Sequence, residues 1–144
     1  IRRQRQMCIR DRSICSLNTK TLELQYAGAY NPLWVIKNST KELIEIKADK
    51  KPIGANTEGE AGQYKNNSLQ LQSGDCIYVF TDGFADQFGG VKGKKFMSRP
   101  MKELLISICN KPMQNQLNIL ENTIYTWQGE HEQVDDILII GVRV

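Results

Sequence analysis

The sequence is poor in the residues that most hydrolases use for nucleophilic catalysis. His131 is the only histidine among 144 residues, and it lies in a stretch that reads as a polar loop. A serine or cysteine nucleophile paired with a histidine base would have to rely on this one side chain. The composition therefore argues against that class of hydrolase.

The chain also lacks the marks of a secreted, membrane or zinc-binding protein. Its four cysteines show no Cys-x-x-Cys spacing and no sign of a secreted disulfide framework. No apolar run approaches the roughly 20 residues that cross a bilayer, and the first residues lack the apolar core of a secretory signal. We therefore expect a cytoplasmic location and no membrane contact by this segment.

A basic surface for nucleic acid is absent as well, although the net charge is +3. Five arginines against Asp11 give residues 1–12, IRRQRQMCIRDR, a charge of +4, so the other 132 residues sum to −1. No basic face remains to bind a phosphate backbone, and no nucleic-acid partner is expected. Because QMCIRDR resembles translated sequencing-adapter read-through, we interpret residues 1–12 as non-native. The alternative is a disordered basic tail.

The remaining residues, 13–144, predict one α+β domain. Alternating apolar and polar residues, bounded by turn residues, indicate short strands. The first three are joined by turns too short for crossovers, which predicts an antiparallel meander. The last strand is apolar on both faces and is therefore expected to be central. The predicted strands cover residues 22–26, 33–36, 43–46, 69–72, 76–81 and 137–140.

Two amphipathic helices are predicted between the last two strands. Ser98 is the expected cap of the first and Pro100 lies in its first turn, whereas Pro112 opens the second and Gly129 ends it. Apolar residues recur at helical spacing, so both stripes are expected to face the core. The stripes comprise Met101, Leu104, Leu105 and Ile108 in the first helix, and Met113, Leu117, Leu120, Ile124 and Trp127 in the second.

Aspartates stand at the ends of two apolar strands. The stretch IYVFTDGFADQFGG, residues 77–90, runs from a strand into Asp82 and Gly83, and QVDDILII places Asp135 and Asp136 before the last strand. Each site is compatible with a solvated turn. If the two strands are antiparallel neighbours, however, the carboxylates converge at one sheet edge, where their repulsion calls for a cation. All-oxygen ligands suit a hard ion such as Mg²⁺ or Mn²⁺.

The glycine-rich stretch GGVKGKKF follows Asp86 and has two interpretations. Its lysines, including Lys94 and Lys95, are candidates for binding a phosphoprotein substrate, or they belong to a solvated turn before the first helix. The spacing is not that of a nucleotide P-loop.

Five landmarks in order resemble the C-terminal part of a metal-dependent serine/threonine protein phosphatase. They are LELQYAGAYNPLWVIKN, the loop KKPIG, FTDGFAD, the Gly-Gly-x-x-Gly turn and QVDDILIIGVRV. The branch they resemble is the SpoIIE/RsbU type of the type 2C superfamily. The resemblance implies an antiparallel β-sandwich flanked by helices, with a dinuclear Mn²⁺ or Mg²⁺ centre at one edge.

The resemblance also implies roles for individual residues. Asp82 and Gly83 match the family's later aspartate-glycine metal motif, and Asp135 matches its terminal metal-binding aspartate. Asp136 stands where relatives carry Asp or Asn and is the secondary candidate for direct metal ligation. Asp86 matches an acidic position with a supporting hydrogen-bonding role. No catalytic side chain is expected, because metal-bound water is the family's nucleophile.

One family motif is missing from the sequence. The acidic-x-x-Gly-His-Gly segment of the opening strands does not occur upstream of the meander. We therefore expect the chain to be incomplete at its N-terminus and to have weak or no activity alone. The resemblance implies phosphoserine or phosphothreonine substrates, such as a phosphorylated anti-sigma-factor antagonist in bacterial partner switching, and sensor domains upstream. The alternative is a non-catalytic docking module that retains the fold.

Overall fold

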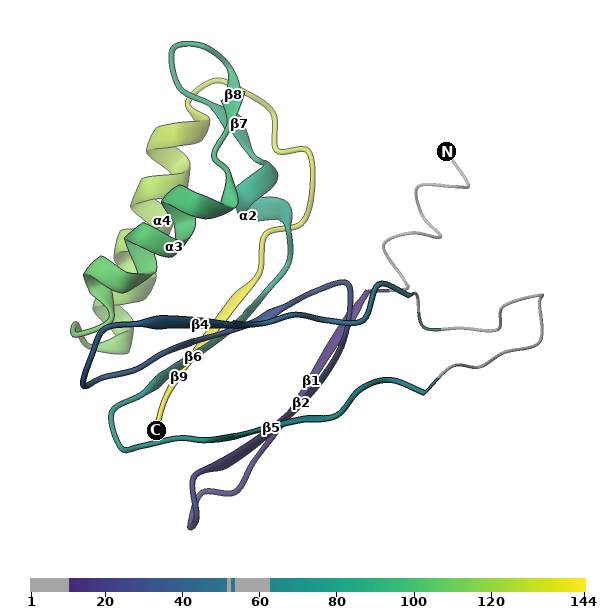
Figure 1. Cartoon of the computed structure of the whole chain (residues 1–144). Coiled ribbons are helices and arrows are strands. Elements are labelled where there is room, and N and C mark those ends of the chain that lie inside the picture. The colour runs from purple at the N-terminus through teal and green to yellow at the C-terminus, as the bar shows by residue number, and fades with distance from the viewer. Residues whose placement is uncertain (1–10, 52, 54–62) are drawn as a thin grey trace, which may run out of the picture.

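A computed structural model describes residues 11–51, 53 and 63–144 of the chain (Figure 1). The predicted α+β class is confirmed, and the two helices lie between the last two strands in sequence. The elements in chain order are β1 (Arg12–Leu17), β2 (Glu23–Ala29), β3 (Leu33–Ile36), β4 (Leu43–Ile46), β5 (Asn67–Gln70), β6 (Cys76–Phe80), α2 (Gly83–Asp86), β7 (Phe88–Gly89), β8 (Lys94–Lys95), α3 (Ser98–Ile108), α4 (Met113–Gln128) and β9 (Ile139–Arg143).

The strands form two larger antiparallel sheets and one small hairpin. The strand orders are β1-β2-β5, β4-β3-β6-β9 and β7-β8. The predicted meander is wrong, because β2 and β3 belong to different sheets. All four residues of β3 are buried, so it needs a central place between β4 and β6, and no side remains for β2. The turn at Tyr30–Pro32 carries the chain from one sheet to the other.

Alternation along β3 builds both hydrophobic cores. Leu33 and Val35 face the space between the two larger sheets, where they join Leu24 and Ile77. Trp34 and Ile36 face the opposite side, where α3 and α4 pack. Since side chains alternate across a strand, one fully apolar strand can supply two cores. The layers are therefore sheet, sheet and helices (Figure 1).

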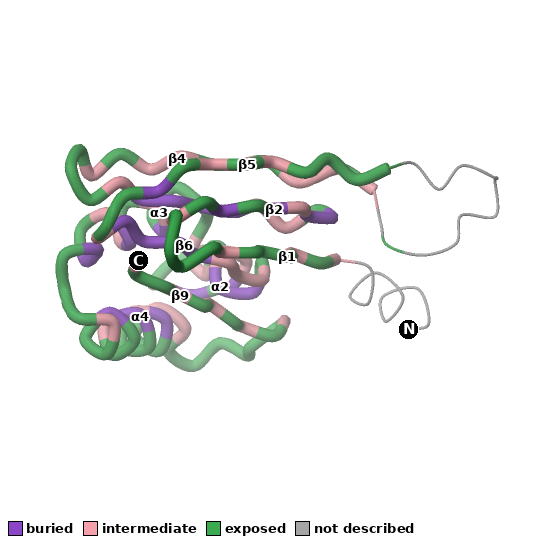
Figure 2. Tube along the Cα trace, turned by 90° about the horizontal axis from the view of Figure 1, so that it is seen from below, coloured by how far each residue is buried: buried purple, intermediate pink, exposed green. Residues whose placement is uncertain are grey.

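The helices bury most of their predicted stripes, with two corrections. Met101, Leu105, Leu120 and Ile124 are buried, and buried stretches alternate with exposed ones along α4 (Figure 2). Leu117, expected in the core, is 47% exposed. Its neighbour in sequence, Gln116, is buried instead, because its amide oxygen accepts a 2.7 Å hydrogen bond from the Tyr78 hydroxyl.

The boundaries of α3 and α4 follow the expected turn residues only in part. Ser98 is the first residue of α3, and the capping position is taken by Met97, which has a φ of 78° and makes no side-chain cap bond. The prediction of a Ser98 cap is therefore wrong. Pro112 does precede α4, and Gly129 ends it with a φ of 55°, where glycine has no Cβ to clash.

The last strand differs from the prediction in both extent and position. β9 begins at Ile139, two residues later than expected, and runs to Arg143. Among the described residues its only strand partner is β6, so it lies at a sheet edge and is not central. Ile140 and Val142 consequently stay 48% and 42% exposed, since no described strand of the other sheet covers them.

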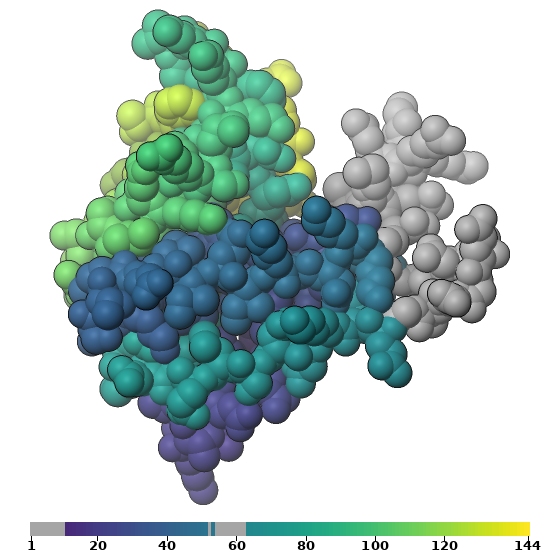
Figure 3. Space-filling view, viewed as in Figure 1, coloured from purple at the N-terminus to yellow at the C-terminus, as the bar shows by residue number. Residues whose placement is uncertain are grey.

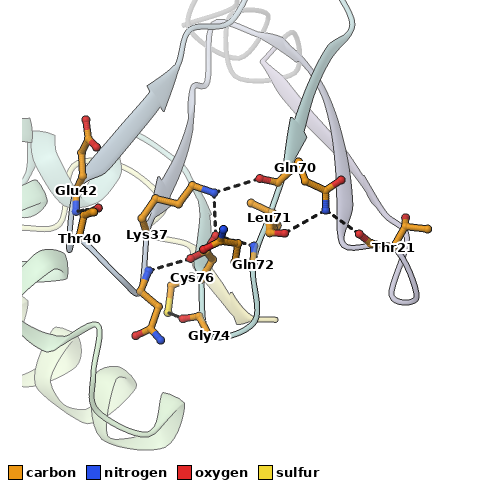
Figure 4. Close-up of polar contacts among 11 residues, drawn as sticks. Thr21, Lys37, Thr40, Glu42, Gln70, Leu71, Gln72, Gly74 and Cys76 are labelled. Atoms are coloured by element: carbon orange, nitrogen blue, oxygen red, sulfur yellow. Dashed lines mark hydrogen bonds and ion pairs between the residues drawn. The ribbon is translucent and has the colours of Figure 1, made fainter.

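A polar cluster joins the two larger sheets at the end of β3. The Lys37 ammonium donates to the Gln70 carbonyl oxygen at 3.1 Å, from one sheet to the other (Figure 4). It also bonds Oδ2 of the buried Asp75 at 2.9 Å. Asp75 further accepts hydrogen bonds from the backbone N–H groups of Asn38 and Gln72. A buried carboxylate with three donors holds the turn before β6 in place.

Pro52 and Gly54 of the KKPIG landmark, and residues 1–10, lie outside the described residues. The described helices include none that is long and apolar enough to cross a membrane. The GGVKGKKF stretch forms the β7–β8 hairpin, which projects beyond the helices (Figure 3).

Candidate metal centre

The two aspartate motifs lie at the same edge of the four-stranded sheet. β6 and β9 are antiparallel neighbours, with Phe80 opposite Ile139. The chain leaves β6 toward Asp82 and enters β9 from Asp135 and Asp136, so both motifs stand at one end of this strand pair. The expected antiparallel pairing of the strands that carry the two motifs is therefore confirmed.

The hydroxyl of Thr81 joins the two motifs. It donates to the carbonyl oxygen of Asp136 at 2.8 Å and accepts from the backbone N–H of Leu138 at 3.0 Å. The Thr81 N–H also donates to the Leu138 carbonyl oxygen at 3.0 Å. Three hydrogen bonds thus continue the β6–β9 pairing past the last ladder residue and fix the segment that carries the aspartates.

Gly83 allows the two backbones to approach closely. A Cβ atom at this position would lie 2.2 Å from the carbonyl oxygen of Asp136 and 2.8 Å from its carbonyl carbon. Real side chains do not tolerate such distances to backbone atoms, so this position requires glycine for space. Gly83 is buried and begins α2, directly after Asp82.

Electrostatics indicate that the carboxylates of the two motifs are close enough to repel. Partial burial raises the pKa of Asp82, and the neighbouring charges of Asp135 and Asp86 raise it further. A raised pKa means that this environment destabilises the ionised carboxylate relative to its protonated form. Asp135 is half-buried and its Oδ1 accepts from the backbone N–H of Asp136 at 2.8 Å. Asp136 is exposed, and the contact that it makes with Thr81 uses its backbone carbonyl group.

Asp86 connects the turn after Asp82 to a lysine of the hairpin. The Asp86 N–H donates to the Asp82 carbonyl oxygen, which closes the single turn of α2. Its Oδ1 forms an ion pair with Lys95 Nζ at 3.0 Å. Lys94 lies beside Lys95 in β8 and is exposed.

The residues at this edge suit a hard divalent cation but form only part of a site. Asp82 and Asp135 offer carboxylate oxygens, which Mg²⁺ and Mn²⁺ prefer, and a cation between them would relieve the repulsion at Asp82. Within the described part of the chain, however, no group of three or more His, Cys, Asp or Glu side chains is arranged to hold a metal ion. The described carboxylates therefore fit one side of a metal centre.

A cavity of about 570 Å³ opens beside the first aspartate motif. Asp82 and Asp86 form part of its lining, together with the aromatic rings of Tyr30, Trp34 and Phe80. The cavity is large enough for an amino-acid side chain or a small ligand.

Sequence reasoning missed several residues at this edge. One sequence feature could have indicated the role of Thr81: its hydroxyl directly precedes the candidate metal ligand Asp82, where it can form hydrogen bonds to a neighbouring segment. Glu45 and Lys102, which form a 2.7 Å ion pair near the cavity, gave no signal, since they are far apart in the sequence. Asp11, which lies in the segment interpreted as non-native, also lines the cavity.

Comparisons with known proteins agree with the fold and the order of these motifs. The family model of stage II sporulation protein E, SpoIIE, matches residues 11–144. The SiaA-PP2C domain of Pseudomonas aeruginosa superposes with a TM-score of 0.82 at 32% identity, covering 93% of this chain and 51% of that domain. No curated protein sequence matches the chain significantly.

Two more distant structures share the fold. The Mn-presoaked SpoIIE phosphatase domain of Bacillus subtilis gives a TM-score of 0.66 at 14% identity, covering 93% of this chain and 56% of that one. The structure of the RsbU and RsbW domains of Rv1364c from Mycobacterium tuberculosis gives a TM-score of 0.68 at 19% identity. The match covers 99% of this chain and 39% of that one. The chain thus spans about half the length of the SiaA and SpoIIE domains that it matches.

The family model covers nearly the whole chain, and the identity to the SiaA domain is substantial over almost the same residues. The chain belongs to the SpoIIE family of type 2C phosphatase domains.

Proposed function

We propose that this chain is part of a Mn²⁺- or Mg²⁺-dependent phosphatase that hydrolyses phosphoserine or phosphothreonine in a protein. The observation that carries the proposal is the bridge from Thr81 to the Asp136 carbonyl oxygen, which supports the convergence of Asp82 and Asp135 at one edge. Family membership and the Mn-presoaked relative are consistent with it.

The residues proposed to hold the metal are Asp82, Gly83 and Asp135, with Asp136 as the secondary candidate ligand. When bound, a pair of divalent cations supplies activation of water and neutralisation of phosphate charge. The chain's own contribution is to hold the carboxylates in position: Thr81 fixes the segment before β9, and Gly83 leaves space for it. Asp86, bonded to Lys95, stabilises the turn that follows Asp82.

The proposed substrate is a phosphorylated anti-sigma-factor antagonist in a bacterial partner-switching pathway, in the cytoplasm. Support comes from the relative whose structure holds RsbU and RsbW domains in one protein. Lys94 remains a candidate for contacting the phosphoprotein, because it is exposed on the hairpin next to the site. Lys95 already pairs with Asp86 and would have to be shared. We also propose that sensor domains precede this segment in the full-length protein.

The second candidate is a non-catalytic docking module. It is favoured by the incomplete ligand set among the described residues. In this case the fold would present a surface to the same phosphoprotein without hydrolysing it.

Phosphate release from a phosphoserine protein separates the two candidates. The complete natural gene product is assayed with and without Mn²⁺, next to Asp82→Asn and the control Glu121→Gln, which makes the same charge change on an exposed face of α4. We expect turnover that needs Mn²⁺, is abolished by Asp82→Asn and survives Glu121→Gln. Binding of the phosphoprotein without turnover would support the docking module instead. For the 144-residue chain alone we expect little turnover.

A further inference from the structure

The cavity beside Asp82 combines an aromatic wall with carboxylates. Trp34 and Phe80 pack with ring centroids 4.2 Å apart and planes inclined by 51°. Trp34 is buried beneath the cavity, whereas Tyr30 is 49% exposed at its rim. Rings of this kind offer faces on which a planar or cationic group can stack.

Tyr30 is held at the rim by the backbone and not by burial of its ring. Its φ of 63° is unusual for a residue with a side chain. Its N–H donates to the Asp49 carbonyl oxygen at 3.0 Å. The carbonyl oxygen of the next residue, Asn31, accepts from the Ser13 hydroxyl at 3.1 Å and from the Tyr26 hydroxyl. Strained backbone that its surroundings hold in place is found preferentially at functional sites.

The charge of the lining has one sign. The lining includes the carboxylates of Glu45, Asp82 and Asp86, besides Asp11 of the segment interpreted as non-native, and no lysine or arginine is among the described lining residues. Lys102 pairs with Glu45 and Lys95 with Asp86, so part of this negative charge is compensated from outside the lining. A cationic ligand complements such a lining, whereas an acidic one would be repelled.

The protein's own lysine shows that this combination of ring and carboxylate holds a cation. Lys102 Nζ lies 2.7 Å from Glu45 Oε2 and 5.1 Å from the centroid of the Trp34 ring. The Trp34 Nε1–H donates to the same carboxylate oxygen at 2.8 Å. These contacts involve Glu45 and Trp34, whereas Tyr30, Phe80, Asp82 and Asp86 are further residues of the lining.

We propose that this cavity is a specificity pocket for a lysine or arginine side chain of the phosphoprotein, next to the phosphorylated residue. The inference rests on the proposed function, because Asp82 belongs both to the cavity and to the candidate metal centre. A peptide whose phosphate is at the metal would therefore place a neighbouring side chain at Tyr30. The arginine guanidinium would stack on Tyr30 and Phe80 and pair with the carboxylates.

Fluorescence anisotropy with labelled peptides tests the pocket. The Mn²⁺-loaded chain is titrated with phosphoserine peptides that differ at one flanking position, which carries Arg, Leu or Glu. We expect the Arg peptide to bind about tenfold more tightly than the Leu peptide, the size of a partly desolvated cation–π contact with a carboxylate nearby. Equal affinities, or a preference for Leu or Glu, would overturn the pocket.

Two variants connect the preference to the cavity. Tyr30→Gly removes the ring but accepts the positive φ, so the turn is preserved; we expect the preference for Arg to fall below about twofold while the Leu peptide binds as before. Tyr125→Ala removes another exposed tyrosine, 67% exposed on α4, and should change nothing. A preference for Arg that survives Tyr30→Gly would contradict the assignment.

An unphosphorylated pair of the Arg and Leu peptides separates this inference from the proposed function. If the Arg preference persists without phosphate and is lost in Tyr30→Gly, the pocket is supported even if phosphatase activity fails. If phosphate strengthens binding but Arg and Leu peptides bind alike, the phosphatase proposal is supported and the pocket is refuted.

Discussion

The Thr81 hydroxyl bonds the carbonyl oxygen of Asp136 at 2.8 Å, although the two residues belong to motifs that are far apart in the chain. The Thr81 hydroxyl oxygen also accepts a hydrogen bond from the N–H of Leu138 at 3.0 Å. One side chain therefore fixes the position of the second aspartate motif relative to Asp82, and the predictions for the metal centre depend on it.

Replacing Thr81 by valine removes both hydrogen bonds of the hydroxyl at nearly constant volume. We expect Mn²⁺ affinity to fall by about 10- to 100-fold, as it does when groups that orient metal ligands are lost. Thr81→Ser keeps the hydroxyl and should restore the affinity. A calorimetric titration of all three proteins with Mn²⁺ measures this, and equal affinity of the valine variant and the wild type would contradict a positioning role.

Gly83→Ala tests the close approach of the two backbones. The added Cβ would stand 2.2 Å from the Asp136 carbonyl oxygen, so the segment before β9 has to move. We expect lower thermal stability and loss of Mn²⁺ binding. Gly129 has a φ of 55° but no atom within 4 Å of a Cβ, so Gly129→Asn is a control for backbone strain alone and should bind Mn²⁺ normally.

Leu120 and Leu117 provide a matched pair on one helix. Leu120 is 8% exposed and belongs to the core beneath the helices, whereas Leu117 is 47% exposed. We expect Leu120→Ala to lower the free energy of unfolding by about 2–5 kcal/mol, and Leu117→Ala to lower it by less than about 1 kcal/mol. Urea denaturation of both variants gives the comparison, and similar losses would mean that α4 packs through a different face.

Asp75 predicts an acid-sensitive contribution to stability. Burial alone would raise its pKa, but the N–H groups of Asn38 and Gln72 and the Lys37 ammonium outweigh burial and lower the pKa below its usual value of 3.8. A lowered pKa in the folded state means that the stabilisation is complete well above pH 4. It is lost as the pH falls from about 4 through the folded-state pKa.

Denaturation at several pH values checks this contribution. At pH 7, Asp75→Asn should be less stable than the wild type by about 3–5 kcal/mol, since it leaves Lys37 without its buried partner. The difference should shrink as the pH falls below 4. A difference that stays constant from pH 7 to pH 3 would exclude the Asp75 charge as its cause.

How far the sequence predicts this molecule depends on whether a feature is local. Strand β3, the helical stripes of α3 and the Gly129 terminus follow from periodicity and turn chemistry, and the structure confirms them. The edge shared by Asp82 and Asp135 follows from one added supposition, the β6–β9 pairing. These features need only neighbouring residues or a single long-range pairing.

The sequence does not predict features in which residues from distant parts of the chain compete for the same neighbours. The division of β2 and β3 into two sheets depends on which strands flank β3, and no local pattern records that choice. Gln116 displaces Leu117 from the core because the Tyr78 hydroxyl needs a partner there. The Trp34–Glu45–Lys102 cluster likewise combines residues from three elements.

Manganese binding by the 144-residue chain tests the central claim most directly. The electron paramagnetic resonance signal of free Mn²⁺ is measured during titration of the wild type, Asp82→Asn, Asp135→Asn and the Glu121→Gln control. We expect the wild type and the control to bind Mn²⁺ alike, and each aspartate variant to bind about tenfold more weakly or not at all, because each loses a carboxylate ligand. Binding that is unchanged in Asp82→Asn and Asp135→Asn would contradict a metal centre at this edge.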